Sequence, residues 1–131
     1  MTNGKGGRAT YGLLGRNISY SLSPVMHNAA FKHFGIPAVY KLFDIEESEL
    51  DSFFRDLVSG AGISGINVTV PYKIWFHDEL KARKEHDVDG SAESLGVVNT
   101  VKVEGPHLTG YNTDGRGFYA CGYSNKNGCI S

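Results

Sequence analysis

The sequence lacks the features that mark a membrane protein or a nucleic-acid-binding protein. No apolar run approaches the roughly 20 residues that a helix needs to cross a bilayer. The 13 basic and 14 acidic side chains nearly cancel, so net charge gives no reason to expect binding to nucleic acid or to an anionic membrane. The opening segment MTNGKGGRAT contains no apolar core of the kind found in signal peptides. We therefore expect a cytoplasmic protein without nucleic-acid or membrane partners.

Cysteine is scarce and the histidines are scattered, so the sequence shows no pattern for a metal site. Cys121 and Cys129 match no zinc-binding spacing, and a reducing cytosol would keep both as free thiols. The histidines show no paired spacing typical of metal ligands; they are His27, His33, His77, His86 and His107. We therefore expect no bound metal.

A dinucleotide-binding motif is also missing. The segment Gly115–Ala120 (GRGFYA) satisfies the spacing G-x-G-x-x-G/A, but this fingerprint needs an apolar strand before it and an acidic residue about 20 positions later. The residues before it are polar, and no acidic residue follows Asp114. We therefore expect no nucleotide site in this chain.

What the sequence does contain is an alternation of strand and helix patterns. Its 131 residues, of which 40% are hydrophobic and 21% charged, suit one globular domain. Helices follow the first three of the expected strands, which cover residues 10–15, 38–45, 63–70, 97–103 and 108–112. This alternation favours parallel neighbours, whereas a turn at 104–106 would make the last two strands an antiparallel hairpin. We therefore predict an α/β domain with a mixed sheet.

Two of the expected helices have clear signals. Ser23 followed by Pro24 predicts a helix with Ser23 as its N-cap, running to about Phe34, where Gly35 would end it. One apolar stripe of this helix consists of Met26, Ala30 and Phe34. The next helix repeats apolar residues at the spacing of an amphipathic helix, with Leu50, Phe53, Phe54, Leu57 and Val58.

The stretch INVTVPYK (residues 66–73) combines a strand with polar groups near its end. Its two alternating sets are the apolar Ile66, Val68 and Val70 and the polar Asn67 and Thr69. Because side chains alternate along a strand, the two sets should point to opposite faces of the sheet. Pro71 would end the strand and open a helix, so that Lys73 lies in the first helical turn. Ligand sites in open α/β sheets lie at such strand ends.

Three further clusters place polar side chains near strand or helix ends. Ser21 and Ser23 precede a helix N-terminus, where hydroxyls and free N–H groups can hold a carboxylate or phosphate. Asn99 ends an apolar run, and a third cluster consists of Asn112, Thr113 and Asp114. Taken singly, each cluster is also consistent with helix caps or solvated side chains. Together they describe polar groups gathered at the ends of several strands.

In this order, four motifs resemble the N-terminal substrate-binding half of shikimate dehydrogenase. They are S-x-S-x-S-P-x-x-H-N-x-x-F from Ser19, N-V-T-V-P-Y-K from Asn67, G-V-V-N-T from Gly96 and G-Y-N-T-D-G-x-G-F from Gly110. The resemblance covers most of the chain, about Tyr11 to Phe118. It implies a three-layer α/β/α domain with a mixed, mainly parallel sheet, and the family's Rossmann domain is absent from the sequence.

The resemblance implies the reduction of 3-dehydroshikimate to shikimate with NADPH, in aromatic amino-acid biosynthesis. Ser21 and Ser23 would bind the substrate carboxylate, and Lys73 and Asp114 would form the catalytic pair. The residues lining the substrate site would be Asn67, Thr69, Lys73, Asn99 and Asp114. Such a lysine ammonium can stabilise a developing alkoxide and donate the proton that a reduced ketone needs.

The resemblance also divides the chain. It implies a substrate-binding domain at 10–118 and an atypical tail at 119–131 in place of the NADP-binding domain, while the Gly-rich, polar residues 1–9 predict a flexible N-terminus. We therefore expect the chain to be inactive alone, with apolar surface that is left exposed and favours self-association. Two alternatives stay open: a non-catalytic binder of shikimate-like hydroxy-carboxylates, and a fragment of a quinate dehydrogenase.

Overall fold

The computed structural model describes residues 8–113, which form one six-stranded sheet with flanking helices. The strands are β1 (Ala9–Gly15), β2 (Ala38–Asp44), β3 (Ile63–Val68), β4 (Asp87–Val88), β5 (Thr100–Glu104) and β6 (His107–Tyr111). The helices are α1 (Ser23–Phe34), α2 (Leu50–Ser59), α3 (Lys73–Ala82) and α4 (Gly90–Glu93), with a 3₁₀ turn η1 (Glu47–Glu49) before α2. In the described range, no helix is long and apolar enough to cross a membrane.

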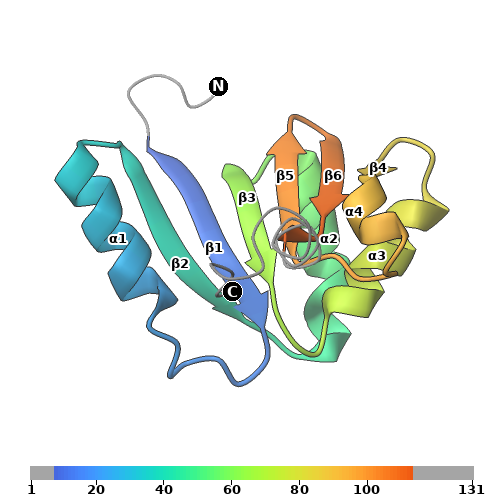
Figure 1. The fold of residues 1–131 in the computed structure, drawn as a ribbon, viewed down its shortest axis with the longest axis horizontal. Coiled ribbons are helices and arrows are strands. Elements are labelled where there is room, and N and C mark those ends of the chain that lie inside the picture. The colour runs from blue at the N-terminus through green and yellow to red at the C-terminus, as the bar shows by residue number, and fades with distance from the viewer. Residues whose placement is uncertain (1–7, 114–131) are drawn as a thin grey trace, which may run out of the picture.

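The sheet is mixed, with the strand order β2-β1-β3-β5-β6-β4 (Figure 1). β1 pairs in parallel with β2 and β3, and β4 pairs in parallel with β6. β5 runs antiparallel to β3 and β6, and Gly105, at a φ of 63°, takes the left-handed conformation in the β5–β6 turn. The prediction of a mixed, mainly parallel sheet with a final hairpin is confirmed.

Alternation along β3 distributes Ile66, Asn67 and Val68 as predicted, whereas Val70, predicted on the face of Ile66 and Val68, lies beyond the end of β3 and is 66% exposed. Ile66 and Val68 are 3% and 2% exposed and belong to the core, while Asn67 points to the opposite face. The helices α2 and α3 cover the core face with Leu50, Phe54, Leu57, Phe76 and Leu80. Full burial of each such side chain contributes about 1.5–3 kcal/mol, so this face holds the domain together.

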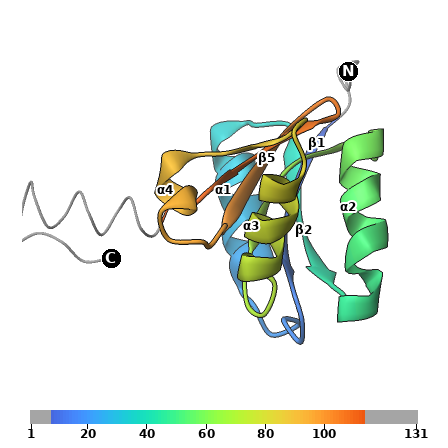
Figure 2. The same cartoon turned by 90° about the vertical axis from the view of Figure 1, so that its right-hand side faces the viewer.

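The helix α1 lies on the other face of the sheet, which completes three layers (Figures 1 and 2). His27 stacks on Tyr40 of β2, with ring centroids 4.2 Å apart, and Phe31 lies 6.1 Å from Tyr11 of β1. The predicted stripe of Met26, Ala30 and Phe34 is therefore not the face that packs. It points away from the sheet, and Met26 is 65% exposed.

Several details differ from the sequence-based expectations, and three of them concern element boundaries or an unexpected strand. Ser23 is not the N-cap of α1, because Leu22 takes that position and Ser23 is the first helical residue. β3 ends at Val68 rather than at residue 70. The strand β4 lies outside all of the expected strands, because two residues are too few to show a strand period.

Several predictions fall on residues outside the described range. These are the catalytic role of Asp114, the free thiols of Cys121 and Cys129, the segment Gly115–Ala120, the C-terminal boundary at residue 118, the tail at 119–131 and the flexibility of residues 1–7.

Candidate functional site

One edge of the sheet gathers the ends of β1 and β3 and the start of β5 (lower edge in Figure 1). The Thr69 N–H donates to the Leu14 carbonyl at 2.9 Å, so the loop after β3 runs along the end of β1. A Cβ at Gly15 would lie only 2.6 Å from Thr69 Cγ2 and 3.2 Å from the Val70 carbonyl oxygen, so glycine permits this close approach. Within residues 8–113, the predicted site residues lie on the strand ends, loops and helix starts at this edge.

Hydrogen bonds join Asn67 and Asn99 across this edge. Asn67 pairs with Thr100 in the β3–β5 register, and its Nδ2 lies 3.4 Å from Thr100 Oγ1. Thr100 Oγ1 donates to Asn99 Oδ1 at 3.0 Å, and Asn99 Nδ2 lies 3.2 Å from Thr113 Oγ1. The side chain of Asn99 is thus hydrogen-bonded in a residue only 8% exposed, rather than a solvated strand residue.

Lys73 is the first residue of α3 and is half-buried. The Val98 N–H donates to the Lys73 carbonyl at 3.1 Å, which fixes the start of α3 beside the segment leading into Asn99. The Tyr72 N–H donates to the Thr69 carbonyl at 3.1 Å. A helix N-terminus carries a partial positive charge. This charge adds to the positive potential of the Lys73 ammonium group, so this end of α3 favours negative charge nearby.

The two predicted serines stand together at the start of α1. The Ser23 N–H donates to Ser21 Oγ at 3.1 Å, so Ser21, not Ser23, supplies the side-chain acceptor at this helix end. Asp44, at the end of β2, holds the preceding loop by accepting the N–H groups of Asn17 at 2.8 Å and Ile18 at 3.1 Å. Ser21 and Ser23 are both half-buried.

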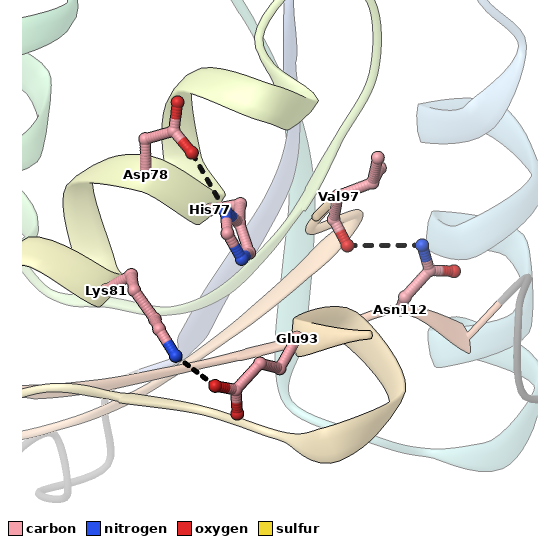
Figure 3. Close-up of polar contacts among 6 residues, drawn as sticks. All are labelled: His77, Asp78, Lys81, Glu93, Val97 and Asn112. Atoms are coloured by element: carbon pink, nitrogen blue, oxygen red, sulfur yellow. Dashed lines mark hydrogen bonds and ion pairs between the residues drawn. The ribbon is translucent and has the colours of Figure 1, made fainter. Parts of the chain in front are cut away.

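Asn112 anchors the end of β6. It is 5% exposed, and its Nδ2 donates to the Val97 carbonyl at 3.1 Å (Figure 3). Elsewhere in the same view, the ion pair of Lys81 and Glu93 joins α3 to α4 (Figure 3). The Asn112 bond ties the end of β6 to Val97, and Asp114 lies outside the described residues.

A groove with a volume of about 480 Å³ opens beside Asn67, on the sheet face that α1 partly covers. Its lining includes Tyr11, Phe31, Tyr40 and Thr100. Tyr40 Oη donates to Asn67 Oδ1 at 2.8 Å, and burial raises the pKa of Tyr40 to about 12. The phenol is therefore protonated at neutral pH and can act as the donor in this bond. Within residues 8–113, no group of three acidic, histidine or cysteine side chains could hold a metal ion.

Sequence reasoning missed three side chains that organise this edge. Tyr40 was one residue of an alternating strand pattern, which does not reveal where its hydroxyl points. Asp44 closes the same strand and gave no motif. Thr100 follows Asn99 in the motif GVVNT, so its place beside a candidate residue was the one available signal.

A family model described as the shikimate dehydrogenase substrate binding domain matches residues 13–101 of this chain. The chain belongs to this family. Shikimate dehydrogenase (NADP(+)) of Bacillus subtilis (strain 168) is 45% identical over 108 residues, which cover 82% of this chain and 36% of that enzyme. The chain thus spans about a third of the length of this relative.

Solved structures agree with the family assignment. Shikimate 5-dehydrogenase from Listeria monocytogenes, solved in complex with shikimate and NAD, is 34% identical with a TM-score of 0.76 and covers 87% of this chain and 37% of its own. A ligand-free 5-ketofructose reductase of Gluconobacter sp. strain CHM43 is 27% identical with a TM-score of 0.76, covering 90% of this chain and 40% of its own. The shikimate dehydrogenase substrate-binding fold therefore also occurs in a reductase named for another ketone.

Proposed function

We propose that this chain is the substrate-binding half of a shikimate dehydrogenase, which reduces 3-dehydroshikimate to shikimate with NADPH in aromatic amino-acid biosynthesis. The main support is that Asn67, Asn99 and Lys73 gather at one strand edge in a member of this family. The name of the Bacillus subtilis relative and the shikimate bound to the Listeria enzyme favour the same substrate.

The proposed roles follow from the chemistry of the side chains. Ser21 and Ser23, at the amino end of α1, would hold the substrate carboxylate through hydroxyl and backbone donors. Asn67, Thr69 and Asn99 would hydrogen-bond the ring oxygens. In the reducing direction, Lys73 would stabilise the negative charge on the carbonyl oxygen and donate its proton, and Asp114 would orient Lys73.

The described residues do not fit NADP. A dinucleotide is usually held by a glycine-rich turn between a strand and a helix, where backbone N–H groups approach the phosphates closely. The segments that lead into α1 and α3, RNISYSL and TVPY, contain no glycine. We therefore place the cofactor on a part of the full-length family enzyme that this chain does not include, and assign to this chain only the handling of substrate and proton.

Titration calorimetry with shikimate tests the proposal on the chain as it is. We expect binding, and Asn67→Ala and Asn99→Ala should each weaken it about fivefold to tenfold, since a hydrogen bond contributes about 1 kcal/mol. Thr109→Val, on the same sheet face but outside the proposed site, is the control and should leave the affinity unchanged. Absence of binding by the unmodified chain would contradict the proposal.

A steady-state assay with shikimate and NADP⁺ tests the companion expectation that the chain alone is inactive. No element described here positions a nicotinamide against the substrate carbon, so turnover should stay at background. Robust turnover by the 131-residue chain would overturn that expectation. A Lys73→Ala variant that still binds shikimate would be consistent with a role of Lys73 in proton transfer. It would also be consistent with the alternative that the chain is a non-catalytic binder of shikimate-like hydroxy-carboxylates.

Quinate is the competing substrate. It carries an additional hydroxyl on the carbon that bears the carboxylate, so the groups around Ser21 and Ser23 would decide between the two ligands. The shikimate in the Listeria enzyme favours shikimate. Parallel titrations with shikimate and quinate compare the two affinities directly, and tighter binding of quinate would reverse the assignment.

We also infer that the protein is cytoplasmic and that two copies associate through the outer face of α1. This face exposes Leu22, Val25, Met26 and Phe34 at 68%, 67%, 65% and 71%. Large apolar side chains exposed together are typical of interaction surfaces. Sedimentation over a broad concentration range should show self-association that Met26→Lys abolishes, while Leu95→Lys, at an exposed apolar residue elsewhere, should not. A monomer at every concentration would contradict the inference.

A further inference from the structure

A directed chain of hydrogen bonds starts at Tyr40 and crosses the sheet. Tyr40 Oη donates to Asn67 Oδ1 at 2.8 Å, and Asn67 Nδ2 donates to Thr100 Oγ1 at 3.4 Å. The Thr100 hydroxyl then donates to Asn99 Oδ1 at 3.0 Å. Each member thus donates to the next one, from β2 through β3 to the start of β5.

We propose that Tyr40 is a positioning residue, which fixes the side-chain amides of Asn67 and Asn99 so that both present N–H donors to oxygen atoms of the bound substrate. This role rests on the proposed function, because it specifies how that site recognises a polyhydroxylated carboxylate. It adds a residue of β2 that belongs to none of the four motifs of the site.

The direction of each bond determines what the asparagines can offer. An amide has one acceptor oxygen and two N–H donors. Asn67 Oδ1 is occupied by Tyr40, and Asn99 Oδ1 accepts from Thr100 and also from the Thr113 N–H at 3.0 Å. Asn67 Nδ2 donates one N–H to Thr100 Oγ1, and Asn99 Nδ2 donates one N–H to Thr113 Oγ1. One N–H of each amide is left for a ligand oxygen.

Tyr40 is itself fixed from two sides. The Asn28 side chain of α1 accepts the Tyr40 N–H at 2.8 Å and donates to the Tyr40 carbonyl at 3.0 Å. β2 is an edge strand of the sheet, with a neighbouring strand, β1, on one side only. On its other side, the Asn28 amide supplies the hydrogen bonds that a further strand would make. His27 stacks on the ring at 4.2 Å with an interplanar angle of 17°. The hydroxyl that orients Asn67 is therefore held at a defined position.

Removing one oxygen atom isolates this role. Tyr40→Phe keeps the ring, the stack on His27 and both backbone bonds to Asn28, but frees Asn67 Oδ1. The amide can then rotate, so shikimate should bind about fivefold to tenfold more weakly, the loss expected for one hydrogen bond. Tyr11→Phe is the matched control, because Tyr11 pairs with Tyr40 in the β1–β2 register and its hydroxyl bonds to no described residue.

A double-mutant cycle separates positioning from general stabilisation of the fold. If Tyr40 acts through Asn67, Tyr40→Phe should have no further effect on shikimate affinity once Asn67→Ala is present. The proposal is overturned if the losses of shikimate affinity in Tyr40→Phe and Asn67→Ala add in the double variant. It is also overturned if Tyr40→Phe binds shikimate as tightly as the unmodified chain. Failure of the unmodified chain to bind shikimate would instead refute the proposed function.

A second readout needs no ligand. In ¹⁵N-labelled protein, Tyr40→Phe should shift the side-chain Nδ2 signals of both Asn67 and Asn99, while Tyr11→Phe should leave them in place. Unchanged backbone N–H signals in residues away from β2 and β3 would show that the variant retains the fold. Unchanged amide signals in Tyr40→Phe would show that no chain of bonds transmits orientation, which overturns the inference whether or not shikimate binds.

Discussion

Asp44 should control the loop that carries Ser21, although it lies on the next strand. Its carboxylate accepts the Asn17 N–H at 2.8 Å and the Ile18 N–H at 3.1 Å. Asn17 has a φ of 58°, a left-handed conformation that asparagine adopts more readily than other residues with a side chain, but still less readily than glycine. Asp44→Ala removes both acceptors and leaves the β1–β2 backbone pairing intact.

The expected magnitude follows from the exposure of the two donors. Asn17 is exposed, so water can replace the lost acceptor, whereas Ile18 is 4% exposed and its N–H would be left without a partner. A hydrogen bond to a charged group contributes about 1.5–3 kcal/mol. After discounting the exposed bond, we expect Asp44→Ala to lower the free energy of unfolding by about 2 kcal/mol. Asp44→Asn keeps one acceptor oxygen and should lose about half as much.

Two measurements test this reasoning. Urea unfolding can be followed by the fluorescence of Trp75, the single tryptophan, which packs 5.9 Å from Phe54 between ring centroids. Calorimetric titration should show shikimate affinity falling about tenfold, because the freed loop must be ordered again on binding. Asp56→Ala, at an exposed position on α2, is the control. Wild-type stability and affinity in Asp44→Ala would refute the argument.

Three further predictions concern the stability of the domain. Burial lowers the pKa of His86, whose ring accepts the Leu108 N–H at 3.1 Å. The unfolded chain therefore binds a proton that the folded protein does not, so stability falls as the pH drops below about 6.5; urea unfolding of His86→Leu should show a weaker loss over this range. Gly12→Ala places a Cβ 2.3 Å from the Phe43 ring and should cost about 1–3 kcal/mol in urea unfolding. Phe76→Ala, at a residue with no exposure, should cost about 3–5 kcal/mol in the same assay, and a loss below about 1 kcal/mol would contradict its place in the core.

The controls for these variants differ. An unchanged pH dependence in His86→Leu would mean that other groups cause the acid sensitivity. Gly35→Ala, where a Cβ meets no atom within 4 Å but φ is 66°, separates the steric clash at Gly12 from backbone strain. If both glycine variants lose equal stability, the contact with Phe43 is not the cause.

The part of the fold that sequence predicts well has a strong periodic signal. Leu50, Phe54 and Leu57 recur at helical spacing and are all buried in α2. The alternation of Ile66, Asn67 and Val68 gives both the core face and the polar face of β3. These periods are set by backbone geometry, which is the same in any fold, so they can be read without knowing the neighbours.

The helix α1 shows where such reading fails. It carries apolar residues around much of its circumference, so its sequence offers two candidate faces. Packing against Tyr11 and Tyr40 selects the side of His27 and Phe31 and leaves Met26 exposed. The choice depends on the shape of the sheet beneath the helix, which local sequence does not contain.

For the candidate site, the sequence by itself determined which polar groups stand at strand ends, because alternation places Asn67 on β3 and the helix that begins after Pro71 places Lys73 in its first turn. Only the tertiary structure decided which groups meet and in what direction they bond. The strand order brings Tyr40 Oη within 2.8 Å of Asn67 Oδ1, although the two residues are 27 positions apart in the sequence. Antiparallel pairing of β3 and β5 places Thr100 beside the same Asn67 amide. Hydrogen bonds act over a few ångströms of space, and the fold alone sets which residues come that close.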